Sequence, residues 1–295
     1  MKLPLSASRA AWIALTLVLL HASAGCDVNS ALERVSEARR LSADLLVQFT
    51  KAADASNRAV MADTDEASVA FAREAEQAKQ TVQTTIDALG PILRGLNFPE
   101  ETQLLQEFVN QFAEYRDLDR RTLDLAVENT NVKAQRLSFG PAQEAADAFR
   151  DALESIAPAD AAKDAWRMKA LVVTAVVTVR EMQVLQAPHI AEADEAVMTR
   201  MEKRMATSEA AARAALEALA PLVQPASRPR LAAATAALDK FVGLNAQIMA
   251  LSLRNTNLRS LALALNQKGK VTGACEHSLQ SLRDALSKRG FYGTR

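Results

Sequence analysis

The chain contains few aromatic residues and few helix breakers. Aromatic residues make up 4% of the 295 residues, and glycine and proline number nine each. Long alternating runs of β-branched residues, the usual signature of strands, are nearly absent. Alanine, leucine, glutamate and arginine, which are good helix formers, dominate instead. The sequence therefore predicts an all-α fold, and its length is sufficient for two domains of ordinary size.

Neither sign of charge is in excess, because 35 lysine and arginine residues balance 35 aspartate and glutamate residues. A basic excess would point to nucleic acid, and an acidic excess would point to a solvated tail. The balance gives no support for a nucleic-acid partner.

The residues that build catalytic centres are also scarce. The chain has three histidines, and one of them, His21, lies in the N-terminal segment. A di-metal carboxylate bundle needs paired Glu-x-x-His motifs. His189 instead precedes Glu192 in the reverse order beside a predicted helix break, which favours a loop contact. Haem-attachment, phosphate-binding, zinc and nucleophile-elbow motifs are missing from the sequence. We therefore expect a protein that is not an enzyme and that uses no cofactor or metal.

The N-terminus has the pattern of an export signal. Two basic residues precede the apolar run 10–20, which is too short to span a bilayer comfortably. Cleavage after Ala24 is one expected outcome and an uncleaved anchor is another. The favoured outcome follows from Ser-Ala-Gly-Cys at 23–26, which resembles a bacterial lipobox. It predicts a lipoprotein-type signal peptide over 1–25, lipidation of Cys26, and a bacterial periplasmic protein tethered to the membrane.

The second cysteine, Cys275, has two interpretations. If Cys26 carries lipid, Cys275 is a lone thiol on a helix, and we expect it to act as a small, half-buried hydrophobe. If Cys26 escapes lipidation, the two cysteines could form a disulfide. The most apolar run outside the N-terminus is 170–179, and its length fits a buried core helix better than a transmembrane helix.

Breakers and capping residues divide the chain after Val28 into eight predicted helices. Asp63 and Glu66 have capping-box spacing, and Gly140-Pro141 and Gly269 are interpreted as breaks between helices. The expected helices are 30–61, 63–94, 99–139, 141–157, 160–186, 190–223, 227–266 and 271–287. Residues 289–295 are expected to form a flexible tail.

The second half of the sequence repeats the first. The recurring segments are 64–67 and 193–196, 88–91 and 218–221, 125–131 and 251–257, and 150–153 and 283–286. An internal duplication is the simplest explanation. Because the connections between helices are short, neighbouring helices should pack antiparallel. The sequence therefore predicts two tandem antiparallel four-helix bundles, 27–157 and 158–288, after the N-terminal signal segment.

One asparagine occupies the same place in the apolar seam of both halves. The seam over 241–265 alternates spacings of three and four and includes Asn255, and the seam over 115–132 includes Asn129. A polar amide at a core position costs stability unless it finds partners. These asparagines either fix register by pairing with another helix or a buried water, or line a small polar pocket in each bundle. The expected solvated-face charges beside them are Glu128, Lys133, Arg254 and Arg259.

The Asn-Thr-Asn segments carry a resemblance to a known family. Residues 123–134 and 249–262 resemble the third helix of the four-helix-bundle sensor domain of methyl-accepting chemotaxis proteins, and 64–67 resembles the start of its second helix. The resemblance covers nearly the whole mature chain, counted twice. It implies a periplasmic module that senses a small molecule or a binding protein that carries one. The second membrane span, signalling hairpin and methylation region of that family are missing from this sequence. The resemblance therefore implies a detached tandem module, with Asn129 and Asn255 as its matching positions.

Two functions are compatible with these patterns. The leading hypothesis is a non-catalytic periplasmic, sensor-like module that binds a small-molecule ligand. The alternative is a structural or interaction lipoprotein that presents helix faces to an envelope protein partner, with Asn129 and Asn255 only setting register. Related sensor bundles commonly dimerise, so a homodimer is a further expectation from the resemblance.

Overall fold

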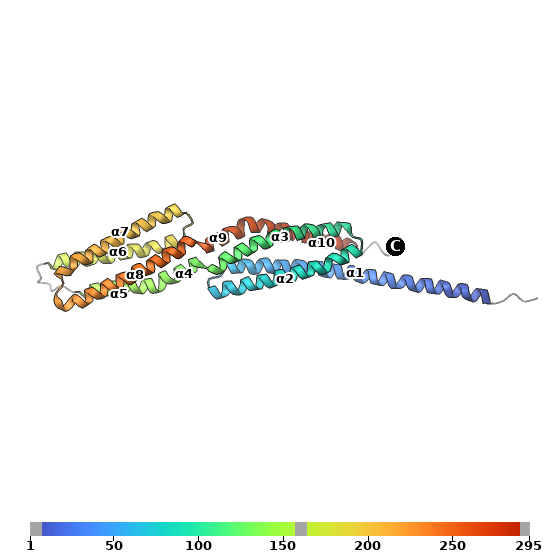
Figure 1. The fold of residues 1–295 in the computed structure, drawn as a ribbon, viewed down its shortest axis with the longest axis horizontal. Helices are drawn as coiled ribbons and strands as arrows, with labels where there is room; N and C mark the ends of the chain where they lie inside the picture. Colours follow the sequence, from blue (N-terminus) through green and yellow to red (C-terminus); the bar gives the residue numbers. More distant parts are fainter. Residues whose placement is uncertain (1–7, 157–163, 290–295) are drawn as a thin grey trace, which may run out of the picture. The chain divides into compact units, whose positions relative to one another are not determined.

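A computed structural model describes residues 8–156 and 164–289, with side chains from residue 31 onward. The described chain is all-α, and no strand occurs within it, which confirms the predicted fold class (Figure 1). The α-helices are α1 (Ser8–Met61), α2 (Asp65–Gly95), α3 (Pro99–Glu128), α4 (Thr130–Leu137), α5 (Gln143–Glu154), α6 (Ala165–Ala191), α7 (Glu195–Leu219), α8 (Arg228–Arg254), α9 (Thr256–Leu263) and α10 (Gly269–Lys288). Two π-helical turns, η1 (Ser138–Ala142) and η4 (Ala264–Lys268), and two short 3-10 turns, η2 (Ala220–Leu222) and η3 (Pro225–Ser227), complete the described elements.

Two of the sequence predictions fall mostly outside this description. The side chains of residues 1–30, including Cys26, are not among those described, so the signal segment and the lipidation site stay predictions. Of the predicted tail, only Arg289 is described.

The described chain divides into two compact units. Unit 1 comprises the chain up to Arg58, residues 70–120 and the chain from Ala264, and unit 2 comprises 59–69 and 121–263. Unit 1 therefore contains most of α1, α2 and α3 together with α10, and unit 2 contains α4 to α9. Each half of the chain thus places its last helix, α5 or α10, in the unit that is built mainly from the other half.

This grouping differs from the consecutive bundles 27–157 and 158–288 that the sequence predicts. The prediction required the chain to reverse direction at Gly140-Pro141 and at Gly269. Both places instead lie in or directly after a π-helical turn, and the chain continues without a loop. A π turn already interrupts the regular ladder of hydrogen bonds, so it accommodates a proline that has no N–H.

The two π turns occupy equivalent positions in the duplication. Each begins nine residues after the asparagine of its half, at Ser138 after Asn129 and at Ala264 after Asn255. At the second turn a Cβ on Gly269 would lie 3.2 Å from the carbonyl oxygen of Ala264. Glycine therefore fits this position because it lets the backbone approach that carbonyl closely.

The core of unit 1 is aromatic. Its buried rings meet edge to face or stack, with centroids 5.0–6.2 Å apart; they are Phe49, Phe108, Phe112 and Tyr115. Each such pair adds roughly 0.5–1.5 kcal/mol beyond the burial of its area. Helix α10 covers these rings with Cys275 and three leucines. It runs antiparallel to α1, since Lys268 before its start bonds to Ser56 and its end bonds to Arg39 through the Leu286 carbonyl.

The core of unit 2 is mainly aliphatic. Helices α6 and α7 contribute methionines, alanines and valines, among them Met182, Met201 and Met205. Two fully buried rings, Phe149 from α5 and Phe241 from α8, join them.

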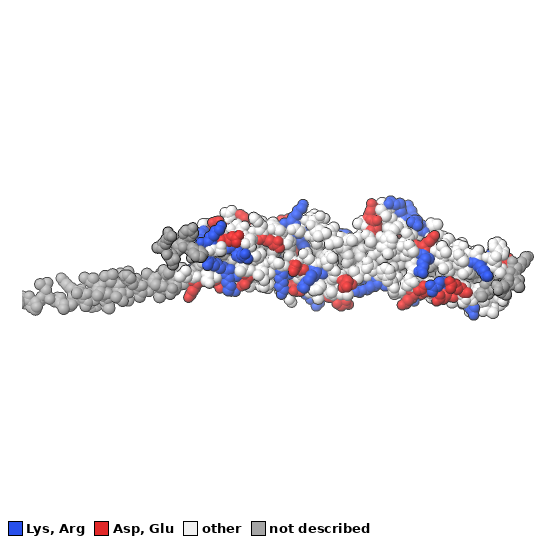
Figure 2. All heavy atoms as spheres, turned by 180° about the vertical axis from the view of Figure 1, so that it is seen from behind, with Lys and Arg blue, Asp and Glu red and all other residues white. Residues whose placement is uncertain are grey.

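On the surface, basic and acidic side chains are interspersed over the face shown in Figure 2, in line with the balanced composition.

Candidate functional site

Asn129 and Asn255, the two predicted site residues, each end a helix rather than lie within one. Their φ angles are 54° and 52°, in the left-handed region. Asparagine adopts this conformation more readily than other residues with a side chain. The chain therefore kinks at Asn129 between α3 and α4, and at Asn255 between α8 and α9.

The structure brings the two kinks together in unit 2, in what we call the Asn-Thr-Asn joint (residues 129–131 and 255–257). The N–H of Thr130 donates to Oγ1 of Thr256 at 3.1 Å, and the N–H of Thr256 donates to Oγ1 of Thr130 at 3.2 Å. The N–H groups of Asn131 and Asn257 donate to each other's Oδ1 at 3.0 and 3.2 Å. The first N–H groups of α4 and α9, which lack partners within their own helices, are thus capped reciprocally.

The side-chain amides of the joint are also satisfied by the protein. Oδ1 of Asn129 accepts from Nδ2 of Asn257 at 2.6 Å, and Oδ1 of Asn255 accepts from Nδ2 of Asn131 at 2.8 Å. Nδ2 of Asn129 donates to Asp65 and Nδ2 of Asn255 to the Glu192 carbonyl. With these bonds made, the geometry favours the register role over the pocket role for both asparagines.

The four charges beside the joint do more than face solvent. Arg254 and Glu128 form an ion pair at 2.8 Å across the joint. Lys133 donates to the Glu128 carbonyl at 2.7 Å, and Arg259 donates to the Arg254 carbonyl at 3.4 Å. Each cation thereby caps the C-terminus of the helix that precedes its own kink.

A buried ion cluster in unit 1 was not anticipated from the sequence. Asp119 has no exposed surface, and its carboxylate accepts from Ser56 at 2.5 Å and pairs with Lys79 at 2.8 Å and Lys268 at 3.3 Å. Lys268 also donates to Oγ of Ser56 at 2.6 Å. The Asp119 cluster, as we call these four residues, therefore places two lysines on one carboxylate, and Glu76 at the surface pairs with Lys79.

Burial and charge shift the pKa values around this cluster in different directions. Burial lowers the pKa of Lys268 below its usual value, and the attraction of Asp119 only partly offsets this because Lys79 adds to the lowering. Burial also disfavours the charge on Lys79, but Asp119 and Glu76 together raise its pKa. Burial and the charge of Asp119 raise the pKa of Tyr115 well above its usual value, although the Tyr115 hydroxyl makes no hydrogen bond of good geometry.

Unit 2 contains a neutral polar layer at the equivalent level. Gln186 accepts from Ser138 at 2.7 Å and donates to Asn245 at 2.8 Å. Asn245 lies 126 residues after Asp119, the same offset that relates Thr130 to Thr256. The sequence signal for both layers was available, because Asp119 and Asn245 follow the buried rings of Tyr115 and Phe241 by four residues, on the core side of their helices.

His189 is a core residue rather than the predicted loop contact with Glu192. It is fully buried in the last turn of α6, with Nδ1 2.8 Å from Oγ of Ser252 and Nε2 3.1 Å from Oε1 of Glu202. The order serine–histidine–glutamate is that of a catalytic triad, but the Ser252 hydroxyl donates to the His189 carbonyl at 2.8 Å. A nucleophile must be reachable and must give its proton to the base, and the buried Ser252 hydroxyl meets neither condition. The three side chains instead connect α6, α7 and α8 through hydrogen bonds.

Cys275 is buried more completely than the sequence suggested. It has no exposed surface and is a free thiol in the core of unit 1. Burial, followed by the charges of Glu276 and Glu114, raises its pKa to about 12. Because the thiolate is the reactive form, this thiol is inert in the folded protein.

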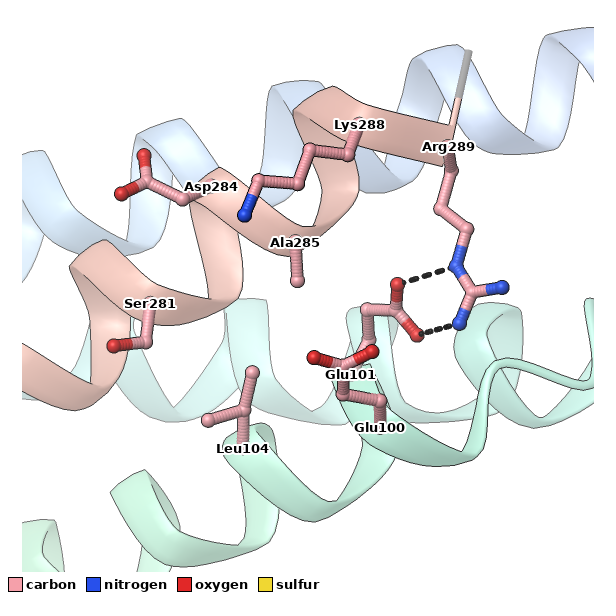
Figure 3. Close-up of a pocket in the computed structure, with 8 residues that line it drawn as sticks. All are labelled: Glu100, Glu101, Leu104, Ser281, Asp284, Ala285, Lys288 and Arg289. Carbon is pink, nitrogen blue, oxygen red and sulfur yellow. Dashed lines mark hydrogen bonds and ion pairs between the residues drawn. The ribbon is translucent and has the colours of Figure 1, made fainter. Parts of the chain in front are cut away.

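An open cavity lies in unit 1 between the first turn of α3 and the last turns of α10. We call it the end cavity; its volume is about 520 Å³ and its lining is Glu100, Glu101, Leu104, Ser281, Asp284, Ala285, Lys288 and Arg289 (Figure 3). Glu101 is fully buried and forms two parallel bonds with Arg289, at 2.7 and 3.0 Å. Arg289 also lies over the ring of Phe98, 4.7 Å from its centroid.

The wall formed by Glu101 and Arg289 is a fixed part of this cavity, because planar two-point pairing holds both side chains. Figure 3 shows Leu104 and Ala285 extending toward the space between the two helices. Glu100, Asp284 and Lys288 are exposed at its rim. The cavity therefore combines an apolar floor with both signs of charge.

Among the described residues, no group of three or more histidine, cysteine, aspartate or glutamate side chains is arranged to hold a metal ion. Searches against protein-family models, curated proteins and solved structures found no match to this chain.

Proposed function

We propose that the protein is a non-catalytic, sensor-like module of the bacterial envelope that binds a small molecule in the end cavity. The observation that carries the proposal is this cavity, whose volume of about 520 Å³ lies in the range of small-molecule sites. The two-point pair of buried Glu101 with exposed Arg289 shapes one wall, so the site is held in place before a ligand arrives. The resemblance of the Asn-Thr-Asn segments to chemoreceptor sensor domains supports the same function.

The chemistry of the lining suits a small zwitterion, such as an amino acid. Glu100 and Asp284 would attract an ammonium group, and Lys288 would attract a carboxylate. Arg289 is already paired with Glu101, so it shapes the cavity and is not the main ligand for an anion. Leu104 and Ala285 would contact an apolar side chain.

Thermal unfolding in the presence of amino acids, organic acids and amines tests the binding. A ligand at 100 times its dissociation constant stabilises the native state by about 2.7 kcal/mol, which raises the melting temperature by several degrees. The variants Glu100→Gln and Lys288→Gln should reduce this shift. Glu144→Gln, at an exposed glutamate of α5 in unit 2, is the control and should leave it unchanged. If no compound in the panel raises the melting temperature, small-molecule binding is refuted.

The proposed location depends on the N-terminal segment. In this proposal residues 1–25 are a lipoprotein-type signal peptide, Cys26 carries the lipid, and the two units are four-helix bundles with exchanged last helices. Incorporation of labelled palmitate in bacteria should occur in the wild type and be lost in Cys26→Ser. Equal labelling of both proteins would refute the anchor.

The alternative function, a structural or interaction lipoprotein, is favoured by a different observation. Helix α6 exposes a row of large apolar side chains that includes Trp166, Val173 and Val184. Under this alternative no small molecule raises the melting temperature, while association through α6 persists.

A further inference from the structure

Helix α6 has apolar side chains on two opposite sides. Its inner side packs into the core of unit 2 through Met168, Ala175, Val179 and Met182. Its outer row consists of Trp166, Ala170, Val173, Val177, Arg180, Val184 and Ala187, all of them exposed. The large side chains of this row are 74% (Trp166), 60% (Val173), 49% (Val177) and 65% (Val184) exposed. Within the described chain, α6 is also the helix that is long and apolar enough to cross a membrane by length and composition.

The equivalent helix of the other half shows that this row is not required by the fold. Shifting the buried positions of α6 back by 130 residues gives buried positions of α1 throughout, for example Met182 onto Ala52 and Gln186 onto Ser56. The same shift carries the outer row onto exposed residues of α1, which are Ser36, Arg40, Ala43, Val47, Thr50, Asp54 and Asn57. The equivalent exposed positions thus hold mostly polar residues on α1, but they hold a tryptophan and three valines on α6.

The spacing of the outer row is that of a helix-pairing seam. Its members alternate spacings of four and three residues over three heptads, which is the pattern that packs against a second helix. A seam of about 32 Å follows from 1.5 Å of rise per residue. We propose that this row is a self-association surface, on which α6 of a second copy of the chain packs antiparallel.

The antiparallel direction follows from the residues in the row. A parallel pair would place Arg180 against its own copy, and like charges in contact repel. In the antiparallel pair with its two-fold axis at residue 175, Val173 packs against Val177 of the second copy, and Trp166 packs against its Val184. Arg180 then lies opposite Ala170, a small residue that leaves room for its side chain to reach water.

Charge complementarity supports the same register. Arg167 and Glu181 lie on the same edge of the row, and both are exposed. In the antiparallel pair like edges of the two helices meet, and Arg167 and Glu181 lie on opposite sides of residue 175. Arg167 of one copy therefore lies near Glu181 of the other copy. Glu181 accepts from Ser208 of α7 at 3.0 Å, so its carboxylate is already held at the edge of the row.

Sedimentation of the full chain in a mild detergent tests the proposal. We expect a dimer in the wild type, and a monomer in Val177→Glu because the charge would be buried at the centre of the interface. The matched control is Val47→Glu, at the equivalent exposed position of α1, which should stay dimeric. A monomeric wild type, a dimeric Val177→Glu, or equal disruption by Val47→Glu would each overturn the proposal.

Cysteine cross-linking in a Cys26→Ser background tests the direction. A mixture of Val173→Cys and Val177→Cys should form mixed disulfides, whereas either variant alone should form few. Self-linking of Val177→Cys alone would overturn the antiparallel register. Co-sedimentation with lipid vesicles tests the other possible occupant of the row, a membrane surface. A wild type that stays monomeric but binds vesicles, with binding lost in Val177→Glu and retained in Val47→Glu, would assign the row to a membrane surface and overturn the proposal.

Discussion

Asp119 in unit 1 and Asn245 in unit 2 occupy equivalent positions, yet their surroundings differ in charge. Asp119 binds two lysines and a serine, whereas Asn245 belongs to a neutral layer with Gln186. Neutral amides can be satisfied by hydrogen bonds alone. Ions must also overcome the cost of leaving water, and replacing a buried ion pair by apolar residues is often neutral or stabilising. The two units therefore share the geometry of this level and differ in its chemistry, and the charged side chains of unit 1 have the higher cost of leaving water.

The largest loss of stability is expected when Asp119 of unit 1 is replaced by asparagine, the residue at the equivalent position of unit 2. Asp119→Asn keeps the shape of the side chain but leaves Lys79 and Lys268 buried without their counter-charge. Breaking a buried pair in this way costs about 3–5 kcal/mol. Urea unfolding at neutral pH measures the loss. Asp117→Asn, at an exposed aspartate of the same helix, is the control and should change stability by less than about 0.5 kcal/mol. A loss below about 1 kcal/mol in Asp119→Asn would refute the ion cluster.

The next effect concerns the joint. Asn255→Leu puts a side chain without hydrogen-bonding groups at a residue whose φ is 52°. It removes the donor to the Glu192 carbonyl and one of the two acceptors of Asn131 Nδ2, which keeps its bond to the Ile190 carbonyl. We expect a loss of about 2–4 kcal/mol from the left-handed backbone and the unpaired groups. The sequence alone predicts the opposite for a register residue, namely that leucine keeps or raises stability in a continuous helix.

Two variants sharpen this test by urea unfolding. Asn255→Gly keeps the backbone conformation at no steric cost, so it should lose less stability than Asn255→Leu. Asn129→Leu, the equivalent change in the first half, should match Asn255→Leu because the bonds are reciprocal. Stability unchanged by both leucine variants would show that the joint is not formed.

The joint also shows how far the sequence could lead. The repeated Asn-Thr-Asn segments identified Asn129 and Asn255 as equivalent core positions, and both are buried. The left-handed kink was not predicted, because the apolar spacing continues past each asparagine. The partner of each segment was not predictable either. Reciprocal capping between 129–131 and 255–257 depends on contacts across 126 residues of sequence.

The exchange of last helices was unpredictable for a similar reason. Gly140-Pro141 and Gly269 break helices in most contexts, and only tertiary packing decides between a reversal and a π turn. Asp119 was missed because the charged run around it resembles a solvated face. Its distance of four residues from Tyr115, a seam position, was the signal that it points into the core.

A smaller, opposite effect is expected at Lys268. Its pKa is lowered, chiefly by burial, so its charge opposes folding wherever the lysine is protonated. Lys268→Met should therefore be neutral or raise stability by about 1 kcal/mol at pH 7, since Asp119 keeps Lys79 and Ser56 as partners. The substitution makes the buried layer of unit 1 more similar to the neutral layer of unit 2, because it removes one of the two cations.

The pH dependence gives this prediction its sign. The cost of the Lys268 charge is fully present below its lowered pKa and is relieved as pH rises toward the unfolded value of 10.5. The advantage of Lys268→Met over the wild type should therefore shrink as pH rises through that window. Lys79 contributes in the other direction, because its raised pKa gives a contribution that is present below 10.5 and lost above it. Urea unfolding of the wild type and Lys268→Met between neutral pH and pH 10.5 measures the Lys268 trend, since the contribution of Lys79 is unchanged over that range. An advantage of Lys268→Met that grows with pH would contradict the assignment.

The smallest effect is expected from the ion pair at the joint, which contrasts with the buried pairs of Asp119. The side chains of Arg254 and Glu128 are 59% and 41% exposed, so water and salt screen their attraction. A double-mutant cycle with Glu128→Gln and Arg254→Gln should give a coupling energy of about 0.2–0.5 kcal/mol that falls as salt is added. A coupling comparable to the loss in Asp119→Asn would mean that charge at the joint matters as much for stability as charge in the core of unit 1, and would contradict this comparison. The reciprocal amides and hydroxyls already satisfy the joint's polar groups, so the physical expectation is that its stability depends on neutral hydrogen bonds and is little affected by salt.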